Sequence, residues 1–326
     1  MSKKLISRTK LFDKFSKQLH LLKENGLIDI ELKYDETYIC PLCLEQFQRV
    51  DLISDTNKNF LTEEDAPPEK LGGSRIALTC KDCNSKAGYQ IDNHLINRIR
   101  ENDDRKFYKG SKQYGNLEYN GERVTAEITS NGDGTLTVLH RTKKNNPNIL
   151  DKFIYGIKNK TIGPILNLEP KKYKIDSERV NLALLKTNYI INFAKFGYIF
   201  LLDKHYDSIR TQIENMDEGY DGQIFLKDQF PKNKEGMYYV LNPGAKSTFS
   251  IFSLKTEYSE TLIGAILPLP NKTPEEIHYS LTGNGYSIGE NGKIGVSLDT
   301  SNYDGGADLF NDLNEINKII NWKNAQ

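Results

Sequence analysis

Two pairs of closely spaced cysteines constrain this 326-residue chain more than any other feature. The first pair is Cys40-Pro-Leu-Cys43, the second is Cys80-Lys-Asp-Cys83, and the sequence holds no other cysteine. Each C-x2-C turn presents two thiolates from a tight loop, which suits tetrahedral Zn²⁺. Four cysteines in a reducing compartment are also more typical of metal ligands than of disulfides. We therefore predict one structural zinc bound by all four; two disulfides or a redox-active pair are the alternatives.

The predicted zinc would support the fold and take no part in chemistry. Four thiolates leave no coordination position for a substrate. The 36 residues between the pairs exceed the usual spacing of a zinc ribbon. We expect them to form an insertion that the metal holds at both ends.

Composition and hydropathy exclude several classes of protein. The apolar fraction of 37% and charged fraction of 27% indicate a globular protein and not a disordered one. No apolar run approaches the length of a membrane span, and the N-terminus lacks the apolar core of a signal peptide. We expect a cytoplasmic protein without membrane contact. The sequence gives no oligomeric state.

The order of patterns along the chain predicts an α+β protein, with a small zinc-stabilised module followed by a mixed α/β domain. We expect four regions: an N-terminal helical segment at 1–30, the zinc module at 31–103, a polar linker at 104–115 and the mixed domain at 116–326.

Within the mixed domain, Asn131-Gly132-Asp133-Gly134 predicts the turn of a β-hairpin. The apolar segment 181–202 predicts a core helix that ends near Gly197 and is followed by a short strand. Short strands are expected after about residue 220, and a helix at the C-terminus.

Charge is unevenly distributed, although the chain holds 44 basic and 44 acidic residues. Nine Lys or Arg residues lie between Arg141 and Lys174, against two acids. This stretch is either a solvated face or a surface that contacts phosphates.

The insertion between the cysteine pairs contains three successive acids, Glu63, Glu64 and Asp65, and Asn84 follows the second pair directly. Carboxylate and amide oxygens are ligands for hard cations such as Mg²⁺ or Mn²⁺. The zinc would hold these side chains in one module. The alternatives are a solvated acidic turn and, for Asn84, a cap for the helix that follows.

This region resembles a known family. The sequence LTEEDAPP, then Leu71-Gly72-Gly73 and C-x2-C-N-x-K-x-G, is similar to the zinc-knuckled bacterial branch of the HNH (His-Me finger) nucleases. The resemblance covers about residues 36–100. A weaker similarity, around Leu184–Gly197, concerns a segment that follows the nuclease module in some such proteins.

The resemblance implies that the zinc-stabilised module has a ββα-metal fold, in which a hairpin and a helix enclose one divalent cation. Glu64 matches the family's metal ligand, and Asn84 matches the residue that either binds the cation or orients the base. Asp65 stands where the family has its catalytic histidine. Aspartate is a weaker base by about 2.5 pKa units unless burial or Glu63 and Glu64 raise its pKa.

Two further residues are candidates for this site. His94 could supply the missing base, and Asp92 could complete the metal shell. The alternative is that both belong to the polar side of an amphipathic helix.

Three functions remain open at this point. The first is a metal-dependent endonuclease acting on DNA rather than RNA, with a role in restriction or anti-phage defence implied only by the resemblance. The second is a catalytically degenerate zinc module that binds nucleic acid or protein. The third is a hydrolase or sensor with its chemistry in the C-terminal region, where no motif supports it.

Overall fold

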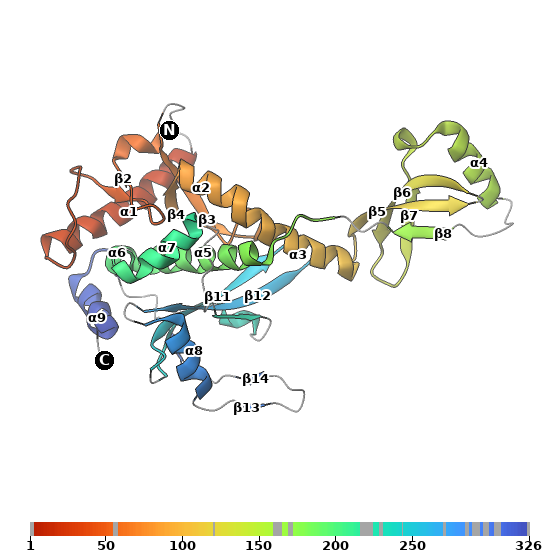
Figure 1. The fold of residues 1–326 in the computed structure, drawn as a ribbon. Helices are drawn as coiled ribbons and strands as arrows, with labels where there is room; N and C mark the ends of the chain where they lie inside the picture. The colour runs from red at the N-terminus through yellow and green to blue at the C-terminus, as the bar shows by residue number, and fades with distance from the viewer. Residues whose placement is uncertain are drawn as a thin grey trace. The chain divides into compact units, whose positions relative to one another are not determined.

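The computed structural model describes most of the chain, in segments: residues 3–54, 58–119, 121–158, 165–168, 172–215, 224–227, 231–242, 244–269, 272–283, 287–288, 294–295, 300–302 and 308–324. Helices and small antiparallel sheets alternate, which confirms the α+β class. The chain forms two compact units (Figure 1). Unit 1 comprises Met1–Leu95, Asp176–Lys255 and Glu260–Gln326, and unit 2 comprises Ile96–Ile175 and Thr256–Ser259.

These units differ from the expected regions. Unit 2 is inserted in unit 1, because the chain leaves unit 1 after Leu95 and returns to it at Asp176. Residues 104–115 do not form a separate linker, since they contain the end of helix α3 (Asn93–Lys106) and the start of strand β5 (Lys112–Tyr119).

Unit 1 begins with helix α1 (Lys3–Glu24), as the sequence predicts. Its apolar residues recur every three or four positions, so one face of the helix is buried. The helix ends just before Gly26, which has the positive φ of +66° that glycine adopts easily. The fully buried side chains are Phe12, Phe15, Leu19 and Leu22.

The cysteine-rich part of unit 1 contains two short antiparallel pairs of strands and a helix. Strands β3 and β4 form a hairpin, and α2 starts directly after β4. A π-helical turn joins α2 to α3. The bounds are β1 (Tyr38–Ile39), β2 (Gln46–Phe47), β3 (Leu61–Ala66), β4 (Ser74–Cys80), α2 (Lys81–Ala87) and the π turn (Gly88–Asp92).

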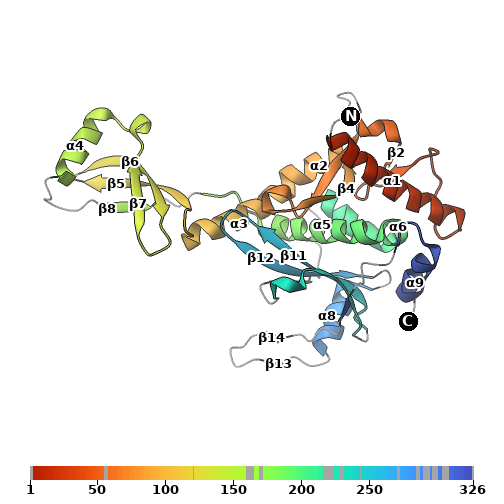
Figure 2. The same ribbon diagram turned by 180° about the vertical axis from the view of Figure 1, so that it is seen from behind.

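Helix α5 (Ser177–Phe196) is the central element of unit 1. It contacts both the β3–β4 hairpin and the strands β11 and β12, and Figures 1 and 2 show it running between them. Asp176 caps its N-terminus by accepting hydrogen bonds from the backbone N–H groups of Glu178 and Arg179. Because elements cover it on several sides, α5 is buried around most of its circumference.

The residues after α5 are helical and not a strand, so that part of the prediction is wrong. Helix α6 (Tyr198–Leu201) follows Gly197 and leads to α7 (Asp207–Glu214). The side chain of Gln18 fixes this junction, since its amide donates to the carbonyl of Phe196 at 2.9 Å and accepts from the N–H of Tyr198 at 2.8 Å. A Cβ at Gly197 would lie 1.9 Å from Gln18 Oε1, so only glycine fits.

The rest of unit 1 is a five-stranded antiparallel sheet in the order β15-β10-β11-β12-β9. Its longest strands match the expected short strands after residue 220. Helix α8 packs on it over an apolar core that includes Phe249, Ile266 and Ile277. The bounds are β9 (Ile224–Lys227), β10 (Gly236–Val240), β11 (Ser247–Lys255), β12 (Glu260–Pro268), α8 (Pro274–Gly283), β13 (Ser287–Ile288), β14 (Ile294–Gly295), β15 (Thr300–Asn302) and the expected C-terminal helix α9 (Leu313–Asn324).

Unit 2 is a four-stranded antiparallel sheet in the order β7-β6-β5-β8, with helix α4 packed on β6. The predicted hairpin is confirmed: β6 and β7 pair on either side of the Asn131–Gly134 turn. A small core of Val124, Leu150 and Phe153 joins the helix to the sheet. The remaining bounds are β6 (Glu122–Ser130), β7 (Leu136–His140), α4 (Pro147–Lys158) and β8 (Ile165–Leu168).

None of the helices in the described segments combines the length and the hydropathy that a membrane span requires.

Candidate metal centre and adjoining carboxylates

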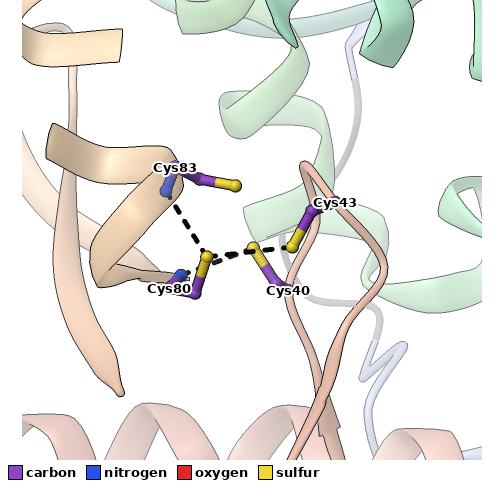
Figure 3. Close-up of side chains that lie close together, drawn as sticks. All are labelled: Cys40, Cys43, Cys80 and Cys83. Carbon is purple, nitrogen blue, oxygen red and sulfur yellow. Dashed lines mark hydrogen bonds between the residues drawn. The ribbon is translucent and has the colours of Figure 1, made fainter. Parts of the chain in front are cut away.

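The four cysteines converge on one point. Their Sγ atoms all lie within 4.8 Å of one another, and those of Cys43 and Cys80 are 3.7 Å apart (Figure 3). Thiolates bound at about 2.3 Å to a tetrahedral zinc are about 3.8 Å apart, so the spacing fits this ion. All four thiols are free, which excludes the disulfide alternative. The prediction of a four-cysteine site that can hold a metal ion such as zinc is confirmed.

The backbone shapes each cysteine pair for this role. In the first pair, the N–H of Leu44 donates to the carbonyl of Cys40 at 3.0 Å, and Leu44 takes a positive φ of +60°. In the second pair, Cys80 caps α2, because its Sγ accepts from the N–H of Cys83 at 3.4 Å. The N–H of Cys80 also points at the Sγ of Cys40, at 3.4 Å. Such N–H groups stabilise thiolates.

Two buried tyrosines bring the first cysteine pair to the hairpin. The hydroxyl of Tyr38 donates to the carbonyl of Leu78 at 2.7 Å and accepts from its N–H at 3.0 Å, which joins β1 to β4. The hydroxyl of Tyr198 makes the same pair of bonds with Ile39, at 3.0 and 2.8 Å. Burial raises the pKa of both tyrosines well above its usual value, so both hydroxyls keep the proton that they donate.

Asn84 fastens helix α2 to strand β3. Its Nδ2 atom donates to Thr62 Oγ1 and to the carbonyl of Glu63, both at 2.9 Å. It does not cap α2, since the helix begins earlier and Cys80 is its cap. The helix-cap alternative is therefore wrong, and Asn84 orients the hairpin strand that carries the acids.

Glu64 and Asp92 do come together, but around a side chain that the sequence patterns did not reveal. The Lys186 Nζ atom lies 2.8 Å from Glu64 Oε1 and 2.6 Å from Asp92 Oδ2. The second oxygen of Glu64 accepts from Thr79 Oγ1 at 2.8 Å. Only 1% of the Lys186 side chain, 3% of Glu64 and 11% of Asp92 are exposed. Three charged groups thus form a cluster sealed from solvent, which we call the Lys186 cluster.

The charges of the Lys186 cluster depend on one another. Burial alone would lower the pKa of Lys186, yet the pKa is raised because Glu64 and Asp92 stabilise the ammonium. Burial raises the pKa of Asp92, while Lys186 acts against that shift. One oxygen of Asp92 is buried without a hydrogen-bond partner.

The arrangement does not fit a catalytic Mg²⁺ or Mn²⁺. The carboxylate oxygens that should face a hard cation already face an ammonium, and the second oxygen of Glu64 is bound by a hydroxyl. Within the described segments, the cysteines are the group of three or more His, Cys, Asp or Glu side chains whose ligand atoms converge. The expected second metal site therefore has no support in the structure.

Asp65 lies on β3, after an irregularity in the hairpin. Glu64 pairs with Ala77 and Asp65 pairs with Arg75, so Ile76 is an extra residue on β4. Asp65 is half-buried, and this burial, followed by the charge of Glu69, raises its pKa to about 6. Smaller effects of Glu64 and Glu63 act in the same direction, and Arg75 opposes them. The condition under which Asp65 could act as a base, a pKa raised by burial or by neighbouring acids, is therefore met.

The three acids are not a solvated turn, because all three lie on strand β3. Glu63 Oε2 is 3.4 Å from Arg75 Nη1, and only 7% of the Glu63 side chain is exposed. His94 is also buried, and its Nδ1 accepts a hydrogen bond of 2.9 Å from the N–H of Asp176. This bond positions the start of α5, the helix that carries Lys186. The alternative of an exposed polar helix face is wrong for Asp92 and His94, since both are buried.

Comparison of the chain with family models, curated proteins and solved structures finds no match in any of the three.

The raised pKa of Asp65 predicts a pH-dependent effect of Asp65→Asn. The folded state binds the Asp65 proton more tightly than the unfolded state, whose pKa is near the ordinary 3.8. Asp65 therefore makes its full contribution to the stability of the folded state below pH 4, where it is protonated, and this contribution is lost as the pH rises towards 6. We expect Asp65→Asn to raise the free energy of unfolding by about 1 kcal/mol at pH 7.5, after allowance for solvent screening, and to leave it unchanged near pH 4.

Urea denaturation at the two pH values tests this. Asp82→Asn, at an exposed acid in the second cysteine pair, is the matched control and should give no gain at either pH. If Asp65→Asn raised the free energy of unfolding equally at both pH values, burial would not be what disfavours the ionised carboxylate of Asp65.

Proposed function

We propose that this chain is a non-cutting, DNA-binding relative of the zinc-knuckled HNH nucleases. The observation that carries the proposal is the Lys186 cluster. The ammonium of Lys186 lies between Glu64 on the hairpin and Asp92 after helix α2, where the resemblance implies a catalytic cation. Phosphodiester hydrolysis needs a cation and an activated water that can reach the scissile phosphate. A sealed ion cluster supplies neither.

Other features support the relationship to this family. Hairpin β3–β4 followed by α2 is the order of elements that the resemblance implies. The contact between Asn84 and strand β3 agrees with an orienting role for this residue. We further propose that the four-cysteine site holds a structural zinc, because its spacing suits Zn²⁺ and its four thiolates leave no open position.

A second candidate, the endonuclease itself, is favoured by Asp65. A carboxylate with a pKa of about 6 is a far better general base than an ordinary aspartate, and half-burial leaves part of it accessible to water. In this reading a cation would have to bind outside the Lys186 cluster.

Cleavage and binding assays separate the two candidates. The non-cutting protein should leave supercoiled plasmid intact in Mg²⁺ or Mn²⁺ and should still shift labelled DNA in EDTA. The nuclease should nick the plasmid, stop in EDTA, and lose at least a hundredfold in rate in Asp65→Asn, which removes the base.

The Asp82→Asn variant serves as the control for that loss. Cation-dependent nicking that Asp65→Asn abolishes and Asp82→Asn retains would overturn the non-cutting proposal. Absence of both nicking and DNA binding would overturn both candidates.

A further inference from the structure

Charge divides sharply between the two units. Unit 2 contains sixteen Lys and Arg residues against ten Asp and Glu, whereas the rest of the chain contains 28 against 34. The net charge is therefore +6 for unit 2 and −6 for the remainder, although the whole chain is neutral. A basic unit of this size attracts polyanions. The net charge of the whole chain, which is zero, gives no indication of this.

The sheet of unit 2 has one covered face and one exposed face. Along β6, Val124, Ala126 and Ile128 are buried, and Val124 packs in the core with α4. The alternate residues point to the other face, and residues paired across an antiparallel sheet share a face. Glu127 on β6 is paired with Tyr114 on β5 and with Leu139 on β7. Tyr114 is 47% exposed and Leu139 58%, so both side chains are accessible on this face.

Arg141 completes this face. Its guanidinium lies over the ring of Tyr114, 4.8 Å from the centroid, and its backbone N–H donates to the carbonyl of Thr125 at 3.1 Å. The turn that follows is fixed by Asn145, whose side chain bonds both the N–H and the carbonyl of Thr125, at 2.7 and 2.9 Å. This turn carries the exposed Lys143 and Lys144.

Such an arrangement suits a single-stranded nucleic acid. An exposed tyrosine ring with a guanidinium over it offers groups on which a base can stack, and adjacent lysines can contact phosphates. The one acid among the paired residues, Glu127, is offset by Lys112 at 2.9 Å. An apolar protein partner would need a more continuous apolar patch than Tyr114 and Leu139 provide.

We propose that the exposed face of the unit 2 sheet, defined by Tyr114, Leu139, Arg141, Lys143 and Lys144, binds single-stranded DNA. The inference rests on the DNA-binding function proposed above and identifies the surface that binds the DNA. Stacking on Tyr114 requires an exposed base, so the face binds single strands more tightly than duplex.

Fluorescence anisotropy with the full chain and a labelled 20-nucleotide DNA tests this inference, with a duplex of the same sequence as comparison. The double variant Lys143→Glu/Lys144→Glu should weaken binding to the single strand by at least tenfold. It should also reduce the slope of log K against log salt by about 1.4, because two phosphate contacts are lost. Tyr114→Ala should weaken binding roughly tenfold and leave the salt slope unchanged.

The matched control is Lys4→Glu/Lys10→Glu, which makes the same change of charge at two exposed lysines of α1 in unit 1. It should alter affinity by less than threefold. Equal losses in both double variants, or duplex binding as tight as single-strand binding, would overturn the inference and leave the DNA-binding function intact. Binding of the wild-type chain to anionic lipid vesicles but not to DNA would overturn both.

Discussion

Replacing Lys186 with methionine should lower the free energy of unfolding by roughly 3–5 kcal/mol, among the largest effects that a single substitution has in this chain. The methionine preserves most of the side-chain volume, so little cavity is created. What the substitution removes is the ammonium that faces Glu64 and Asp92, which lie 2.8 and 2.6 Å from it. Two carboxylates are then left buried and close together, without the positive charge that stabilised them.

The loss should be smaller in acid. Without Lys186, burial and mutual repulsion favour protonation, so the folded state binds more protons than the unfolded state. The stability of Lys186→Met should therefore rise relative to wild type as the pH falls from 8 to 5. Urea denaturation followed by circular dichroism measures this difference.

Two further variants test whether charge is the cause of the lost stability in Lys186→Met. The triple variant Glu64→Gln/Asp92→Asn/Lys186→Met removes all three charges and should recover much of the lost stability. Lys195→Met changes an exposed lysine on the same helix and should stay within about 0.5 kcal/mol of wild type. If the triple variant is as unstable as Lys186→Met at every pH, packing and not charge accounts for the effect.

The Lys186 cluster also shows which contacts can be predicted from the sequence and which cannot. The cysteine site was predictable because each C-x2-C pair is a local signal and a tetrahedral ion needs four such ligands. Glu64 and Asp92 were also identified as residues that could meet. Their partner was not, since Lys186 lies 122 residues from Glu64 along the chain. The apolar segment 181–202 contains two lysines, Lys186 and Lys195, and nothing in the sequence shows that the first is buried and the second exposed.

Long-range packing also explains the errors in secondary structure and domain organisation. The sequence Tyr-Ile-Phe-Leu after Gly197 has strong strand propensity, but Gln18 binds both sides of the glycine and the four residues form helix α6. The sequence patterns did not predict the insertion of unit 2 in unit 1 either. Where the chain returns to unit 1, the N–H of Asp176 donates to His94 Nδ1 at 2.9 Å, a contact between residues 82 positions apart in the sequence.

Removing one cysteine of the proposed zinc site is the second change for which we expect a large effect. Cys80→Ser should reduce the metal content from one zinc per chain to near zero after dialysis against EDTA. Structural zinc sites contribute roughly 10 kcal/mol or more of apparent binding free energy, comparable to the whole stability of a domain. Cys80 also caps α2 and is the last residue of β4, where it pairs with Leu61 on β3. The loss should therefore unfold the hairpin and α2, with a large fall in Tm and rapid proteolysis near residues 40–90.

The control variant lies within the same turn. Lys81→Ser/Asp82→Ser changes the two exposed residues between Cys80 and Cys83, leaves all four thiols, and should keep the zinc and most of the Tm. Atomic absorption and thermal denaturation measure both quantities. Asn84 lies on α2, and Glu64 lies on β3, which pairs with β4. If these elements unfold, Glu64 no longer covers the ammonium, so the zinc-free chain should also lose the protection of Lys186 from chemical acetylation. A Cys80→Ser chain that keeps its Tm, and in which Lys186 is still protected from acetylation, would show that the module folds without a metal. The structural role proposed for zinc would then be wrong.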